Sequence, residues 1–180
     1  SAPEPGFVAV SGNKILAAGP SDGASYAGPD TSILELGDRL ICPGFTDVHC
    51  FFTGYLLTRA GADLNTCADA GQVIEAARAY QQTLEAGATV LARNVLPGLK
   101  ELTTERLDRE FGEVPVILFM EGGESCYMNS AALREYRFTP DTCWSESCWR
   151  LLRYILGQKD FSVTEFKNYL SMMNARGITS

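Results

Sequence analysis

The sequence is poor in the residues that usually reveal a metal site, because its 180 residues include a single histidine. Its six cysteines fall at irregular intervals, and no two of them show the close spacing that is typical of structural zinc sites. A chain of this length does not depend on disulfide bonds to hold a core, so we interpret the cysteines as reduced, mostly buried thiols. A structural zinc built from His49, Cys50 and distant cysteines is the less favoured alternative.

Positive charge is also scarce. The chain carries 15 Lys and Arg residues against 22 Asp and Glu residues, a formal net charge of -7 at pH 7. Such a charge repels phosphate backbones and anionic lipids, which argues against nucleic acid as a partner. No apolar run reaches the roughly 20 residues of a bilayer-spanning helix, and Ser1–Val10 lacks the charged and apolar regions of a signal peptide. We therefore expect a cytoplasmic protein with no membrane partner.

Hydrophobic residues make up 46% of the chain and charged residues 21%, which suffices for a globular core. The N-terminal part contains short β-type runs separated by Gly, Pro, Asn and Asp. Phe7–Val10 and Lys14–Ala18 flank a tight turn at Ser11–Asn13, and Ser32–Leu36 is a third candidate strand. These runs predict part of a small antiparallel β-sandwich, which we assign to residues 1–42.

From residue 43 onward, predicted strands and helices alternate. A helix is predicted over Asp69–Glu85, a strand over Ala88–Val95, a helix over Thr103–Phe111 and a strand over Val114–Met120. The last of these strands is apolar on both faces, which is typical of a parallel sheet. A complete eight-stranded barrel needs about 250 residues. We therefore predict an α/β fold in which residues 43–180 form the first three or four strand–helix units of a partial TIM-type (β/α) barrel.

Further helices are predicted in the C-terminal part of the chain. They cover Asn129–Tyr136 and Ser145–Gln158, and a capping box at Ser162–Glu165 indicates the start of a third, which Gly177 ends. Ile178–Ser180 then has the character of another strand. A partial barrel leaves unpaired backbone groups at its strand edges, and such edges recruit another chain, so we expect self-association as a dimer.

Pro43–His49 reads Pro-Gly-Phe-Thr-Asp-Val-His and includes a short predicted strand, Phe45–Val48. It resembles the opening motif of the amidohydrolase superfamily, PGF-x-D-x-H-x-H, whose two histidines bind a divalent metal at the end of the first barrel strand. Upstream, Val8–Gly19 is similar to the β-sandwich strands of these enzymes. Glu124–Leu133 resembles the H-s-x-w-v-N-S-x-A-L segment of amidohydrolase family 3, which includes formamide deformylases and exoenzyme regulatory proteins. Met173–Ser180 resembles the n-x-x-G-I-T-s stretch of the same family.

The resemblance implies a hydrolase that attacks the C–N bond of a small amide-type substrate with a hydroxide held by zinc or a similar divalent metal. It places His49 at the first metal-ligand position, Asp47 beside it in a supporting role, and Glu124 and Asn129 on the substrate side. The second ligand position holds Phe51, which has no lone pair, and Glu124 stands where the family has histidine. The family's remaining ligands and its catalytic base come from the second half of the barrel. The resemblance therefore identifies the chain as the N-terminal fragment of a parent enzyme, inactive by itself.

Each of these polar residues also has a structural interpretation. His49 is then a hydrogen-bonded residue at a strand end, Asp47 forms a turn, Glu124 is a solvated loop carboxylate and Asn129 caps a helix. The corresponding alternative function is a catalytically silent protein of the same fold, without a metal cofactor and with a regulatory or binding role.

Overall fold

The computed structural model describes residues 4–143 and 148–180, so the predicted helix start at Ser145 lies outside the described residues. The chain divides into two units, Ser1–Gly44 and Phe45–Ser180, and each is described by itself. In the described part of the chain, no helix has both the length and the apolar character needed to cross a membrane.

The first unit is built around a hairpin. β1 (Phe7–Ser11) pairs antiparallel with β2 (Lys14–Gly19), which confirms the first two predicted strands, and Gly12 in the turn adopts a φ of +58°. A short 3-10 helix, η1 (Ala24–Tyr26), follows. The predicted strand at Ser32–Leu36 was wrong: the segment is irregular, since the described part of this unit offers it no strand to pair with. None of the unit's described residues is buried.

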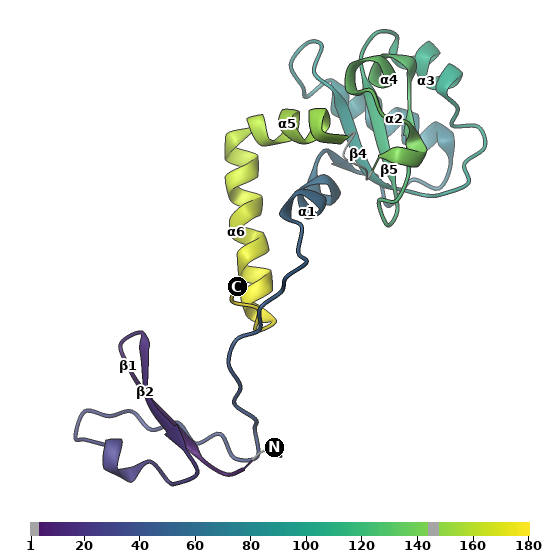
Figure 1. The fold of residues 1–180 in the computed structure, drawn as a ribbon. Coiled ribbons are helices and arrows are strands. Elements are labelled where there is room, and N and C mark those ends of the chain that lie inside the picture. The colour runs from purple at the N-terminus through teal and green to yellow at the C-terminus, as the bar shows by residue number, and fades with distance from the viewer. Residues whose placement is uncertain (1–3, 144–147) are drawn as a thin grey trace. The chain divides into compact units, whose positions relative to one another are not determined.

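A four-stranded sheet forms the centre of the second unit (Figure 1). In spatial order it contains β3 (Ala62–Asp63), β4 (Val90–Val95), β5 (Val116–Met120) and β6 (Cys126–Met128). The first three strands are parallel, and β6 runs antiparallel to β5. Apolar runs in the sequence predict β4 and β5 correctly. They do not reveal β3 and β6, which are too short to show a periodic pattern.

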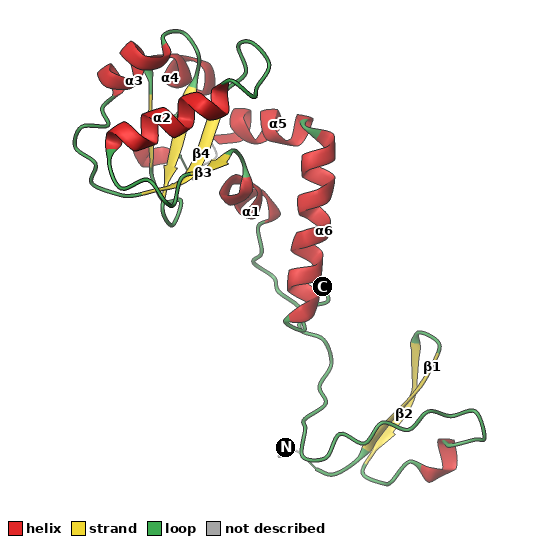
Figure 2. Ribbon diagram, turned by 180° about the vertical axis from the view of Figure 1, so that it is seen from behind, coloured by secondary structure: helices red, strands yellow, loops and turns green. Residues whose placement is uncertain are grey.

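Helices cover both faces of this sheet. α2 (Ala70–Gln81) and α3 (Thr104–Phe111) pack on one face, and Figure 2 shows α2 lying across β4. The core on the other face includes helical segments from both ends of the unit: α1 (Phe52–Arg59), α4 (Ser130–Tyr136), the end of the 3-10 helix η2 (Pro140–Thr142), and α5 (Trp149–Gly157).

The side chains of β4 and β5 alternate between these two cores. Val90, Val116 and Leu118 are fully buried with α2 and α3. Leu91 and Ile117 are buried in the opposite core, with α1, α4 and α5. Because successive residues enter different cores, a shift of one residue in register would exchange the two sets of side chains. The alternation therefore fixes the position of both strands.

Most helix boundaries follow from local capping. Thr103 caps α3, as predicted, and its hydroxyl accepts the backbone N–H of Arg106 at 3.2 Å. The capping-box prediction at Ser162–Glu165 was wrong, because α6 (Lys159–Ala175) begins earlier, directly after α5. Ser162 consequently lies in the first turn of α6, where its hydroxyl donates to the carbonyl of Ile155 at 3.0 Å.

A separate parallel pairing joins the two ends of the second unit. The backbone N–H of Phe45 donates to the carbonyl of Gly177 at 2.7 Å, and that of Asp47 donates to Ser180 at 2.8 Å. These bonds surround a parallel bridge between Phe45 and Ile178. The strands predicted at Phe45–Val48 and Ile178–Ser180 thus form only this short pairing. In the described structure the pairing is not part of the four-stranded sheet.

Gly61 allows the connection between α1 and β3 to approach β4 closely. Its φ is +77°, and a Cβ atom there would lie 2.0 Å from the carbonyl oxygen of Leu91. We expect Gly61→Ala to lower the free energy of unfolding by about 2 kcal/mol or more, because a left-handed backbone and a clash with backbone atoms both oppose the new side chain.

Gly87→Ala is the matched control. Gly87 has a φ of +81°, but no atom lies within 4 Å of the position of its Cβ. Backbone strain alone then costs about 1 kcal/mol. Urea unfolding followed by circular dichroism measures both variants, and equal losses would contradict the proposed clash at Leu91.

Candidate functional site

The segment that carries the candidate metal ligand leads from the parallel pairing into α1. Asp47 is half-buried, and its Oδ1 accepts the backbone N–H of His49 at 3.0 Å. An aspartate that bonds to a backbone amide two residues ahead stabilises a turn. Asp47 therefore has the turn-forming role that was one of its two predicted roles.

His49 is exposed, and its imidazole makes no hydrogen bond within the described residues. The rings of His49 and Phe51 meet edge to face, with centroids 4.8 Å apart and planes inclined at 82°. The side chain two positions after His49 thus lies beside the imidazole, as the spacing of the motif predicts. That side chain is a phenyl ring, which offers no lone pair to a metal.

A buried carboxylate joins α1 to α6 next to this segment. Glu165 is 8% exposed, and its Oε2 accepts the hydroxyl of Tyr55 at 3.1 Å and lies 3.4 Å from Nε of Arg59. Its Oε1 accepts the side-chain amide of Asn168 at 3.3 Å. Burial, followed by the hydrogen bond to Glu165, raises the pKa of Tyr55. The carboxylate is therefore paired on both oxygens, as a buried charge requires.

Aromatic contacts extend this connection toward the candidate ligand. The ring of Phe52 lies 5.1 Å from that of Phe166 and 5.6 Å from that of Tyr169, both on α6. A hydrogen bond with the thiol of Cys50 raises the pKa of Tyr169. This contact between α1 and α6 was not predicted from the sequence. The sequence pattern that could have revealed it is the spacing of Phe161, Glu165 and Tyr169, which recur every four residues and so share one helix face.

Glu124 and Asn129 lie elsewhere in the fold. Glu124 is exposed in the turn between β5 and β6, and Asn129 is fully buried at the start of α4. Oδ1 of Asn129 accepts the backbone N–H groups of Val116 and Ala132, each at 3.0 Å, and Nδ2 donates to the carbonyl of Val114 at 2.8 Å. The predicted helix cap is confirmed. The described structure shows no contact between His49 and either residue.

The described residues do not by themselves fit a metal ion. Among residues 4–143 and 148–180 there is no group of three or more His, Cys, Asp or Glu side chains that could hold one. The chain contributes the imidazole of His49, with the carboxylate of Asp47 nearby but already bonded to a backbone amide. We therefore derive no reaction step through a metal from these residues.

The cysteines mostly belong to the core. Cys67, Cys126, Cys143 and Cys148 are buried, which confirms the interpretation as buried thiols for four of the six, whereas Cys42 and Cys50 are exposed. Burial raises the pKa of the Cys148 thiol to about 12. A hydrogen bond to Cys143, together with burial, also raises the pKa of Cys126. These protonated, buried thiols have the character of small hydrophobic side chains.

Comparison with known proteins gives one similar sequence and one similar structure. YtcJ of Bacillus subtilis (strain 168), a protein provisionally assigned as an amidohydrolase, is 28% identical over 123 residues, which cover 64% of this chain and 23% of YtcJ. The chain therefore spans about a quarter of the length of this relative. The crystal structure of an uncharacterized metal-dependent hydrolase from Pyrococcus horikoshii superposes with a TM-score of 0.44 at 14% identity, covering 77% of this chain and 30% of that one. No profile of a known protein family matches the chain.

Asn129 provides a test of the structural role of a candidate substrate-side residue. We expect Asn129→Ala to lower the free energy of unfolding by about 3 kcal/mol, because it leaves two buried N–H groups without an acceptor. Asn174→Ala is the control, since the Asn174 side chain is exposed and makes no hydrogen bond in the described structure. Its expected change is below about 0.5 kcal/mol. Chemical denaturation measures both, and a loss at Asn129 no larger than that at Asn174 would refute the structural role.

Proposed function

We propose that this chain is the N-terminal part of a metal-dependent amidohydrolase of the family 3 type, which acts on C–N bonds of small amide-type substrates. The observation that carries the proposal is the 28% identity to YtcJ over 123 residues, in a chain that also contains the motif Pro43–His49. Attack by a hydroxide on a divalent metal, zinc or a similar ion, is the chemistry that the parent enzyme would use.

The position of His49 supports its role as the first metal ligand of the parent. The imidazole follows the carboxyl end of a strand segment, Phe45–Asp47, that is paired in parallel. Active sites of (β/α) barrels lie at the carboxyl ends of their parallel strands. In this proposal the chain supplies one imidazole, and the other donors come from the remainder of the parent. The isolated chain is then inactive.

The same pairing supports a proposal for which segments are barrel strands. Sequential parallel strands in a barrel are direct neighbours, so Phe45–Asp47 and Ile178–Ser180 are successive strands of the barrel if they retain this pairing in the parent. Strands β3 to β6 then form a sheet of their own, inserted between the two. This proposal differs from the expectation of three or four consecutive barrel units in residues 43–180, because it counts only two barrel strands among the described residues of that range.

A second candidate function rests on Phe51. Its ring stands beside His49 at the position where the family has its second histidine. A protein that no longer needs to bind an ion loses nothing by placing a phenyl ring there. This observation favours the alternative of a catalytically silent relative with a regulatory or binding role.

Metal analysis of the full-length parent separates the two candidates. For the enzyme, we expect near-stoichiometric zinc, iron or manganese in the purified protein and its loss in His49→Ala, because an imidazole ligand has been removed. Phe51→His is the matched gain-of-ligand variant and is expected to retain or raise the metal content. Elemental analysis by mass spectrometry gives the metal-to-protein ratio.

If the parent holds no metal even after incubation with added metal, and His49→Ala changes nothing, the proposed enzyme function is refuted. That result would support the catalytically silent relative. Loss of metal in His49→Ala is interpretable only if the variant remains folded. His49 is exposed, so circular dichroism is expected to show no change in its unfolding midpoint.

We also propose that the chain as given self-associates through its N-terminal unit. A two-stranded hairpin is marginally stable alone. From residue 4 to residue 44 no side chain is buried, and Ile15 is 70% and Leu16 63% exposed. Light scattering after size-exclusion chromatography is expected to give a mass of about twice 19.6 kDa. Leu16→Lys should shift the protein toward monomer, since an edge-strand lysine opposes pairing. A monomeric mass for the chain without substitutions would contradict this proposal.

A further inference from the structure

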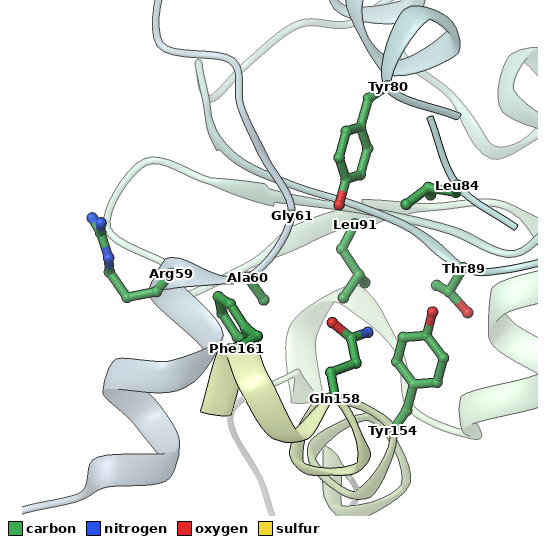
Figure 3. Close-up of a pocket in the computed structure, with 10 residues that line it drawn as sticks. All are labelled: Arg59, Ala60, Gly61, Tyr80, Leu84, Thr89, Leu91, Tyr154, Gln158 and Phe161. Carbon is green, nitrogen blue, oxygen red and sulfur yellow. The ribbon is translucent and has the colours of Figure 1, made fainter. Parts of the chain in front are cut away.

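A small pocket lies away from His49, where four segments of the second unit meet (Figure 3). The end of α1, the end of α2, the start of β4 and the junction of α5 with α6 line a partly open pocket of about 190 Å³. Leu84, Leu91 and Phe161 supply apolar walls. At about 30 Å³ per water molecule, this space matches a small organic molecule better than a single ordered water.

Three polar groups line this pocket without partners of their own. The hydroxyls of Tyr80 and Tyr154 and the carboxamide of Gln158 make no hydrogen bond within the described residues. In Figure 3 the hydroxyl of Tyr80 and the amide of Gln158 point into the same space beside Leu91. The neighbouring Thr89 differs, because its hydroxyl is already bonded to Tyr136. The free groups are therefore available to a ligand.

Two cations lie beside the pocket, Arg59 and Arg93, and each is paired with a carboxylate. The guanidinium of Arg93 donates to the carbonyl of Gly61 at 2.6 Å and lies 3.2 Å from Asp63. Figure 3 shows the guanidinium of Arg59 directed away from the pocket, and that group lies 3.4 Å from Glu165.

Burial raises the pKa of Tyr80, so its phenol is neutral at pH 7. An anionic ligand would lose hydration here and meet only cations that are already paired with Glu165 and Asp63, which is unfavourable. A neutral ligand incurs no such cost.

Backbone atoms form one wall and limit how far the pocket can close. Gly61 approaches Leu91 so closely that a Cβ would lie 2.0 Å from the carbonyl oxygen of Leu91. Ala60, Thr89 and Leu91 on this side are all buried. Leu91 of the sheet thus lies between the polar groups: Tyr80 of α2 is on one side of it, and Tyr154 and Gln158 at the junction of α5 with α6 are on the other.

We propose that this pocket binds a small neutral molecule with a primary carboxamide on an apolar body. A carboxamide offers two donors and one acceptor in a plane, and it pairs reciprocally with the carboxamide of Gln158 through two N–H···O bonds. The phenol of Tyr80 donates to the ligand carbonyl or accepts from its amino group. The apolar body of the ligand covers Leu84, Leu91 and Phe161. This proposal is independent of the proposed hydrolase function.

Benzamide is the probe, and benzoate is the control of the same shape with a charge. Titration into the isotope-labelled chain, followed by amide chemical shifts in NMR spectra, is expected to give saturable changes around Thr89–Leu91 and Gln158. Benzoate is expected to bind at least about tenfold more weakly, because the nearby guanidinium groups of Arg59 and Arg93 are already paired with carboxylates. Equal binding of the two compounds would overturn the proposal, as would the absence of saturable shifts at these residues.

Two variants test the assigned groups. Tyr80→Phe removes one oxygen and Gln158→Leu removes the amide, and each is expected to weaken benzamide binding by about fivefold or more. Gln158 is exposed, so its replacement leaves the fold intact and keeps the test valid if Tyr80→Phe perturbs packing. Tyr26→Phe in the first unit is the matched control and should bind benzamide unchanged. Unaltered affinity in both pocket variants would refute the assignment.

Discussion

Burial of β4 and β5 on both faces is the constraint on which the second unit depends. Val90 and Leu118 enter one core while Leu91 and Ile117 enter the other, so each strand needs a layer of helices on either side. This requirement explains the order of elements along the chain. α2 and α3 connect parallel strands and cover one face, whereas α1, α4 and α5 are recruited from outside these connections to cover the other.

The second layer of helices has a consequence for the ends of the unit. α1 begins directly after the His49 segment, and α6 continues directly from α5. The buried Glu165, with Tyr55 and Arg59 as partners, holds α1 against α6. Two segments that are distant in sequence are thereby brought together, so the pairing of Phe45 with Ile178 does not bear the full entropic cost of closing a long flexible loop.

The elements that could be predicted from the sequence are those with local or periodic signals. The apolar runs of β4 and β5 and the caps Thr103 and Asn129 are of this kind. β3 and β6 carry no such signal, because only their pairing with β4 and β5 makes these short segments strands. The Ser162–Glu165 pattern misled for the same reason. The carboxylate of Glu165 pairs with the half-exposed Arg59 of α1 instead of capping a helix, and α6 begins earlier, at Lys159. Tertiary contacts prevailed over local propensity at each of these places.

The candidate site divides in the same way. Asp47 and Asn129 have the structural roles that were predicted as alternatives to their roles in the motifs, one in a turn and one at a helix cap. Of the candidate metal ligands in the motif, only His49 remains, because Phe51 occupies the second ligand position. Glu124 lies in a separate turn between β5 and β6. A metal ion requires several donor atoms that converge on one point. At the candidate ligand position the described residues supply a single imidazole. His49 is therefore the residue whose replacement distinguishes the proposed enzyme from the proposed silent relative.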